Sequence, residues 1–150
     1  MNARWLDDLT PGMRITTGGI TFTEAGIIDF AYQHDPQPFH IDVVAAAASP
    51  YGGLIASGFQ TLAVTFRLVL QTGIFERSSI GSPGADELRW LQPVRPGDTI
   101  HAVAEVLEVR PSSSKPDRGI ARLRYEAVNQ RGETVLRCEV LHLLLRRPAG

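Results

Sequence analysis

AYQHDPQPFHIDVVAAAASPYGGLIASG, residues 31–58, is the segment around which the rest of the chain is organised. Its first part, residues 35–40 (DPQPFH), places a carboxylate and an imidazole on one loop that two prolines stiffen. Its last part, residues 55–58 (IASG), opens the longest apolar helix that the sequence predicts. Because an acid/base pair and a helix N-terminus lie close together in sequence, the segment indicates chemistry at a polarised carbonyl.

The long helix has recognisable ends. Ser57 and Gln60 have the spacing of a capping box, and Gly73 stands where the residue just past a helix C-terminus is expected. The pattern therefore predicts a helix from Phe59 to about Thr72. Since apolar side chains cover most of its circumference, we expect this helix to be buried.

Two shorter helices precede it. The first is capped by Thr21 or by Thr23, and it ends before Pro36 because the residue that precedes a proline avoids the helical region. Asp42 is the expected cap of a second, short helix over residues 43–48. Both helices therefore lie on the N-terminal side of the long one.

The other predicted elements, after a lead-in over residues 1–12, are strands. Their clearest alternation is in ARLRYEA, residues 121–127, where apolar and charged side chains take turns. Long strands, short turns and one buried helix predict an α+β fold, with a curved antiparallel sheet wrapped around the helix. In a single chain, the opposite side of the sheet and an exposed edge strand would lack cover, so we expect a homodimer. The predicted strands are residues 13–17, 20–22, 85–94, 99–110, 118–129 and 133–146.

Composition limits the classes of function. The 150 residues fit one domain, 1–150, and a formal net charge of −1 without a basic block argues against nucleic acid or an anionic membrane as partner. No apolar run approaches the roughly 20 residues of a membrane span, and the N-terminus lacks the pattern of a signal peptide. Cys138 is the one cysteine, which excludes an internal disulfide. We therefore expect a cytoplasmic protein.

Two motifs resemble those of a known family, the MaoC-like dehydratases and (R)-specific enoyl-CoA hydratases. Residues 35–40 are similar to its D-x-N-P-x-H motif, and residues 51–58 are similar to its Phe/Tyr-Gly-Gly-x-Ile-Ala-x-Gly segment. Residues 92–99, 114–116 and 129–133 resemble turns and a loop further along the same family. The resemblance covers nearly the whole chain. It implies the hot-dog fold, in which a sheet wraps a long central helix.

The resemblance also implies a reaction, the addition of water to a 2-enoyl-CoA thioester, or its removal from the 3-hydroxyacyl-CoA. Asp35 and His40 would be the catalytic residues, with the order of base and acid left open. The backbone N–H of Gly58, at the helix N-terminus, would stabilise charge on the thioester oxygen. The expected substrate is an acyl-CoA or acyl-carrier-protein thioester of fatty acid metabolism. No cofactor is expected other than coenzyme A within the substrate, and the implied assembly is a homodimer or a dimer of dimers.

Further residues are predicted to bind the substrate, and each has a plainer structural reading. Ser57 is the expected N-cap of the long helix, and Gly53 can serve the backbone alone. Phe39 and Tyr51 can line an acyl tunnel or pack in the core. Gln37 stands where the family usually has Asn, and Ser57 stands where many members have His.

Charged residues outside the two motifs have open roles. Lys115 and Arg118 can meet the phosphates of coenzyme A or lie on a solvated hairpin. His34 can tune its neighbour Asp35 or simply be exposed. The remaining histidines are scattered in the sequence, so no metal site is predicted.

Two alternative functions accompany this hypothesis. One is a hot-dog acyl-CoA thioesterase, but such enzymes usually carry a carboxylate on the long helix, and residues 59–72 contain no Asp or Glu. The other is a non-catalytic domain that senses or carries acyl thioesters. The departures at Gln37 and Ser57 leave that reading open.

Overall fold

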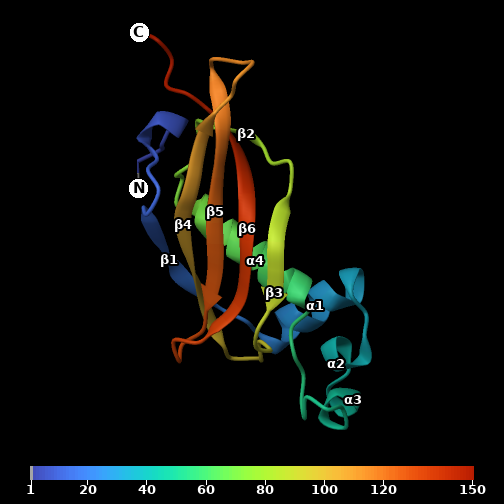
Figure 1. Cartoon of the computed structure of the whole chain (residues 1–150). Coiled ribbons are helices and arrows are strands. Elements are labelled where there is room, and N and C mark those ends of the chain that lie inside the picture. Colours follow the sequence, from blue (N-terminus) through green and yellow to red (C-terminus); the bar gives the residue numbers. More distant parts are fainter. Residues whose placement is uncertain (1) are drawn as a thin grey trace.

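The fold is built on one antiparallel sheet. The computed structural model describes residues 2–150; Met1, the first residue of the predicted lead-in and of the predicted domain, lies outside them. The sheet order is β1-β4-β5-β6-β2, and β3 pairs with β6 beside β2 (Figure 1). The strands are β1 (Arg14–Thr21), β2 (Ser79–Gly81), β3 (Ala85–Trp90), β4 (Thr99–Pro111), β5 (Arg118–Val128) and β6 (Thr134–Leu145).

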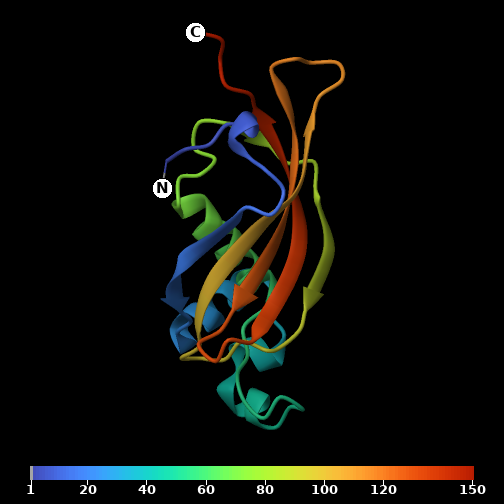
Figure 2. The ribbon, with the colours of Figure 1, turned by 60° about the vertical axis from the view of Figure 1, so that its left-hand side comes forward.

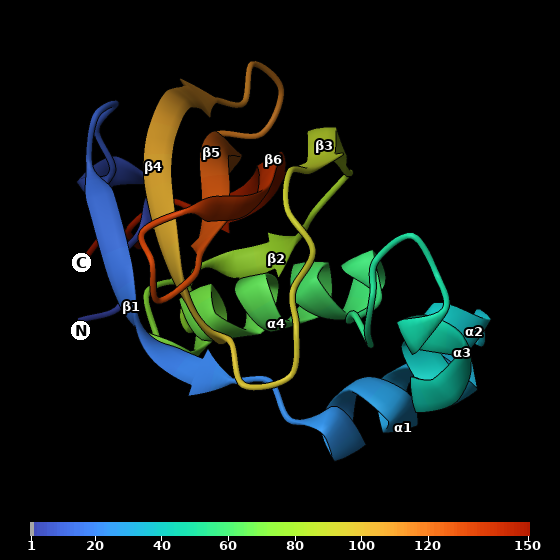
Figure 3. The ribbon, with the colours of Figure 1, turned by 90° about the horizontal axis from the view of Figure 1, so that it is seen from below.

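The sheet curls around one long helix, α4 (Figure 2). Three short helices gather beyond the N-terminal end of α4, as the view along the sheet in Figure 3 shows. This arrangement confirms the predicted α+β hot-dog architecture. Within residues 2–150, none of the helices has the length and apolar character needed to cross a membrane. The helices are η1 (Leu6–Asp8), α1 (Glu24–His34), α2 (Pro38–Ile41), α3 (Val43–Ala47) and α4 (Gly58–Gln71).

The helix ends follow the capping residues that the sequence predicts. Ser57 is the N-cap of α4, where its Oγ accepts a hydrogen bond from the N–H of Phe59 at 3.2 Å. Gly73 has φ +76°, so it takes the left-handed conformation that ends a helix. Of the two possible caps of α1, Thr23 is the one used, since its Oγ1 accepts from the N–H of Gly26. Asp42 caps α3.

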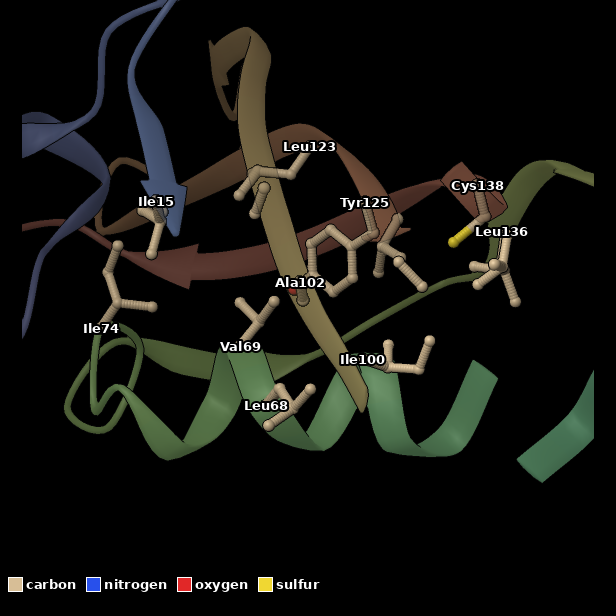
Figure 4. Packing of buried hydrophobic residues seen from close by; sticks show 14 of the residues in the cluster. Ile15, Leu68, Val69, Ile74, Ile100, Ala102, Leu123, Tyr125, Leu136 and Cys138 are labelled. Carbon is tan, nitrogen blue, oxygen red and sulfur yellow. The ribbon is translucent and has the colours of Figure 1, made fainter. Parts of the chain in front are cut away.

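The core lies between α4 and the inner face of the sheet (Figure 4). On β4 and β5 every second side chain is buried, which confirms the predicted alternation. Four of these inner residues are alanines, so the helix can approach the sheet closely while larger side chains such as Leu123 and Val69 fill the space between them. The four alanines are Ala102, Ala104, Ala121 and Ala127.

Three details of the strands differ from prediction. Residues 14–21 form one strand with a bulge between Thr16 and Gly19, because the chain keeps pairing with β4 past the glycine pair. The short strand β2 was not predicted, since three residues carry too little pattern. Finally, β3 ends at Trp90 and not at residue 94, because the chain turns there towards the loop before α4, where the carbonyl of Val94 accepts from the N–H of Ala56.

The expectation that the long helix is buried all round is wrong for the single chain. Thr61, Thr65, Leu68 and Val69 face the sheet and are buried, whereas Phe59 at the start of α4 is 56% exposed. The helix α4 therefore has two apolar sides, and the sheet covers only one of them.

Candidate active site

The candidate site lies at the N-terminal end of α4, where four segments meet. They are the C-terminal end of α1, the turn of α2, the loop over residues 51–57, and the segment over residues 90–94 that follows β3. The first three are close in sequence. The fourth reaches the site only because β3 runs along the edge of the sheet towards the start of α4 (Figure 1).

The Asp35–His40 segment is more regular than the predicted loop. The N–H of Gln37 donates to the carbonyl of Asp35 at 2.7 Å, and the N–H of His40 donates to the carbonyl of Gln37 at 2.9 Å. Pro38 is the first residue of α2, a position that needs no N–H donor. His40 therefore lies on a one-turn helix and not on a loop, which turns its ring back towards Asp35.

Asp35 is held by three side chains. Its Oδ1 accepts a hydrogen bond from Nε2 of Gln37 at 2.7 Å, and its Oδ2 accepts from Oγ of Ser57, also at 2.7 Å. The same Oδ2 lies 3.3 Å from Nε2 of His40. The side chain of Asp35 is 16% exposed, so the carboxylate is largely enclosed yet open to the pocket.

The orientation of His40 follows from its second contact. Its Nδ1 lies 2.7 Å from the carbonyl oxygen of Ile55, and this oxygen can only accept a hydrogen bond. Nδ1 must therefore carry a proton, and Nε2 is the nitrogen that faces Asp35 and can gain or lose one. The contact with Ile55 fixes the ring of a side chain that is only 6% exposed.

The charge state of Asp35 is set by opposing effects. Burial acts to raise the pKa of this carboxyl, but the hydrogen bonds from Gln37 and Ser57, together with the nearby His40, outweigh burial and lower its pKa below the usual value. The carboxylate is consequently ionised at neutral pH. An ionised carboxylate beside an imidazole of fixed orientation is a pair that can pass protons to a bound reactant.

Ser57 performs two tasks. It caps α4 and it donates to Asp35, whereas its part in substrate binding stays a prediction, because Ser57 is fully buried and is not among the residues that line the pocket. Its segment is held on both sides, because the N–H of Ile55 donates to the carbonyl of Phe39 and the N–H of Ala56 donates to that of Val94. The start of α4 is thereby fixed relative to Asp35 and His40.

These residues border a cavity of about 360 Å³, within the range of small-molecule sites. Of the residues that the sequence singled out, Asp35, Gln37, Phe39, His40, Tyr51 and Gly58 line it. Gly58 is the first residue of α4, and its N–H donates no hydrogen bond within residues 2–150. A helix N-terminus with a free N–H favours negative charge on a ligand.

The chain was compared with known proteins. Residues 8–128 match the family described as "MaoC like domain".

The chain belongs to this family.

Relatives and solved structures agree with the match. The uncharacterised protein YdeM of Bacillus subtilis is 31% identical over 142 residues, 95% of this chain and 99% of YdeM. The mesaconyl-CoA hydratase of Cereibacter sphaeroides is 37% identical over 59 residues, 39% of this chain and 17% of that protein. The crystal structure of a MaoC-like dehydratase from Rhodospirillum rubrum is 40% identical with a TM-score of 0.91, covering 98% of this chain and 100% of that one. The (R)-hydratase from A. caviae involved in PHA biosynthesis is 25% identical with a TM-score of 0.72, covering 93% and 98%.

Part of the pocket of this MaoC-like chain escaped the sequence analysis. A further part of the wall comes from residues 90–94, and Phe59 and Thr61 add to it from α4. In the sequence, residues 92–94 resemble only the start of a turn typical of the family. No local pattern in the sequence links residues 92–94 to the DPQPFH motif, because it is the curl of the sheet that brings these two segments together.

Other predicted residues lie away from the pocket. Gly53 is not on the pocket wall and lies beside the guanidinium of Arg95, so its part in binding stays a prediction. Lys115 and Arg118 belong to the β4–β5 hairpin at the opposite end of the sheet (Figure 1). His34 is exposed and packs on Phe30. No three His, Cys, Asp or Glu side chains of residues 2–150 gather closely enough to hold a metal ion, and the predicted absence of cofactors is untested.

Proposed function

We propose that this protein is a hydratase or dehydratase that interconverts a 2-enoyl-CoA thioester with its 3-hydroxyacyl-CoA. The observation that carries the proposal is the pairing of Asp35 Oδ2 with Nε2 of His40 at 3.3 Å, in a pocket that also contains the first N–H of α4. Membership of the MaoC-like family supports it, as does the likeness to proteins named (R)-hydratase and mesaconyl-CoA hydratase.

In this proposal the Asp35–His40 pair shares one proton. During hydration, the carboxylate of Asp35 takes a proton from water while the water oxygen bonds to C3 of the enoyl group. The electron pair of the C2–C3 double bond moves towards the thioester oxygen, and C2 then takes the proton of His40 Nε2. The proton gained by Asp35 returns to Nε2 across 3.3 Å, which restores the pair.

Negative charge that develops on the thioester oxygen needs a donor already in position. The N–H of Gly58 meets this need, because it lines the pocket at the N-terminus of a 14-residue helix. Loss of one such donor typically costs about 10²–10³ in rate. Gln37 and Ser57 act on Asp35 and do not touch the reacting carbons; they are positioning residues.

The finer parts of the proposal concern the setting of the reaction. We propose that the acyl group arrives on coenzyme A or on acyl-carrier protein, in fatty acid metabolism of the cytoplasm. We also propose a homodimer, since the side of α4 that the sheet leaves uncovered exposes Leu70, at the end of the helix far from the pocket. Light scattering on the purified protein measures the mass of the assembly. A monomer would contradict this part of the proposal.

The two alternatives make different predictions. Hot-dog thioesterases usually carry their carboxylate on the long helix, and α4 has none along its length, so we expect no release of free thiol from acyl-CoA. A domain that only binds thioesters would show affinity without turnover. The departures from the family motifs at Gln37 and Ser57 favoured a domain that only binds. They carry less weight in the folded chain, because both side chains donate hydrogen bonds to Asp35.

The test is the loss of enoyl-thioester absorbance when the purified protein meets crotonyl-CoA. We expect turnover by the wild type and a loss of about 10²–10⁴ in kcat for Asp35→Asn, the usual contribution of a positioned acid or base. Calorimetry with crotonyl-CoA shows whether Asp35→Asn still binds. Equal rates for the two proteins, or binding by the wild type without turnover of any enoyl-CoA, would contradict the proposal.

A further inference from the structure

Trp90 lies in an unusual position relative to the start of α4. Its indole packs against the Cα of Gly58 so closely that a Cβ at residue 58 would overlap Nε1 and Cε2 of the ring. Residue 58 therefore has to be glycine for this packing. The indole forms the part of the pocket wall that adjoins Gly58.

An irregularity in β3 directs the indole to this place. Asp86 pairs with Glu139 and Arg89 pairs with Arg137, so two residues of β3 stand opposite one residue of β6. The first of the two, Glu87, has φ +54°, a backbone conformation that residues other than glycine rarely adopt. Such bulges re-aim the side chains that follow them, and Trp90 is the last residue of β3.

The indole is held by apolar contacts alone. It meets the ring of Phe59 edge to face, with centroids 5.4 Å apart and planes at 71°. Its N–H donates no hydrogen bond to any part of residues 2–150, and the residue is 47% exposed. Two large aromatic side chains that are about half exposed at the mouth of a pocket are typical of a surface that a ligand covers.

We propose that Trp90 is a specificity-determining residue whose indole forms the wall against the acyl chain and restricts the substrate to short acyl groups. The inference rests on the proposed function. With the thioester oxygen at Gly58 N–H and C3 near Asp35, the first carbons of the acyl group lie next to the indole. The cavity of about 360 Å³ is at the small end of ligand sites, which is consistent with a wall at this place.

The decisive measurement is the ratio of kcat/KM for trans-2-octenoyl-CoA to that for crotonyl-CoA. We expect Trp90→Leu to raise this ratio at least about tenfold over the wild type, because one methylene in an apolar pocket changes kcat/KM by about 10–200-fold. The ratio for Trp90→Phe should lie between those of the wild type and Trp90→Leu. The matched control is Trp5→Leu, which makes the same change at the other tryptophan of the chain and should leave the ratio unchanged.

A binding measurement keeps the test independent of catalysis and of the fold of Trp90→Leu. The variant Trp5→Leu with Asp35→Asn retains Trp90 as its single tryptophan and is expected to turn substrate over about 10²–10⁴ times more slowly than the wild type. Crotonyl-CoA should change its fluorescence saturably, and free coenzyme A should change it much less, since the acyl group makes the contact. A response equal for the two compounds would overturn the inference.

The outcomes separate the two proposals. If the wild type hydrates crotonyl-CoA and Trp90→Leu keeps the wild-type ratio, the inference about Trp90 is wrong and the proposed function stands. If the wild type hydrates neither thioester, the proposed function fails, and the fluorescence titration decides whether Trp90 contacts an acyl thioester.

Discussion

Two buried histidines lie in different surroundings in this molecule. His40 lies in the pocket, with Nδ1 bound to the carbonyl of Ile55 and Nε2 beside the carboxylate of Asp35. His142, on β6, lies under α4, where its Nε2 is 2.8 Å from the hydroxyl of Tyr125. Both side chains are at most 6% exposed, so burial alone does not distinguish a catalytic histidine from a structural one.

The groups that surround His40 and His142 distinguish the two side chains. His142 is enclosed by the rings of Phe66, Phe75 and Tyr125, and burial without a carboxylate lowers its pKa to about 4. It is neutral at physiological pH and does not change charge there. His40 has an anionic neighbour that can exchange a proton with it. The proposed proton transfer rests on this difference, because His40 has an adjacent carboxylate and lines a cavity, whereas His142 meets aromatic rings and a hydroxyl.

The largest expected effect separates the two histidines by activity. His40→Asn keeps an N–H for the carbonyl of Ile55 and removes Nε2, so kcat with crotonyl-CoA should fall by about 10²–10⁴. The double change His142→Leu with Tyr125→Phe removes the core pair together and should leave kcat within a few-fold of wild type. Steady-state kinetics measures both. A comparable loss of kcat in the double variant would contradict the distinction.

An effect of intermediate size concerns stability in acid. The folded pKa of His142, about 4, lies below its ordinary value of about 6.5 in the unfolded chain, so between these pH values the unfolded state binds a proton that the folded state does not. The free energy of unfolding should therefore fall as the pH drops from 6.5 to 4, by about 3 kcal/mol from this residue.

Urea unfolding at a series of pH values measures this loss. The variant with His142→Leu and Tyr125→Phe is the control, because it lacks the titrating imidazole and leaves no unpaired hydroxyl. Its stability should fall less than that of the wild type over the same range. Parallel curves for the two proteins would show that His142 is not responsible.

The smallest expected effect tests how the carboxylate is tuned. Ser57→Ala removes the hydrogen bond to Asp35 and the cap of α4, at a cost of about 1 kcal/mol in stability. Because that hydrogen bond lowers the pKa of Asp35, the acid limb of the kcat/KM profile should move to higher pH. Thr23→Ala removes a similar cap from α1 without touching Asp35, and it should lower stability while leaving the pH profile in place. If both variants shift the acid limb equally, Ser57 has no specific effect on Asp35.

Much of the fold was predictable because its signals are local. Ser57, Gly73 and Thr23 set helix ends through bonds or dihedral angles within a few residues, and the alternation in β5 followed from its inner and outer faces. The pair Asp35 and His40 was equally accessible, since five positions separate them and one turn of helix is enough to bring them together.

The remaining features depend on contacts between distant parts of the chain. The hydrogen bond from Ser57 to Asp35 spans 22 positions, and its geometry depends on where α4 begins relative to α1. Only the approach of the Ile55 carbonyl to Nδ1 of His40 identifies Nε2 as the ring nitrogen that can exchange a proton. Trp90 reached the pocket through a bulge in β3 and the curl of the sheet, neither of which leaves a periodic pattern in the sequence.

Local signals in the sequence therefore predict the type of fold and the candidate pair Asp35 and His40, because caps, alternation and a short motif act over a few residues. The tertiary structure alone decided which atom of His40 can move a proton, what holds Asp35 ionised, and which indole borders the N-terminus of α4. These properties belong to groups that meet only when the sheet closes around the helix, and no short stretch of sequence contains both partners.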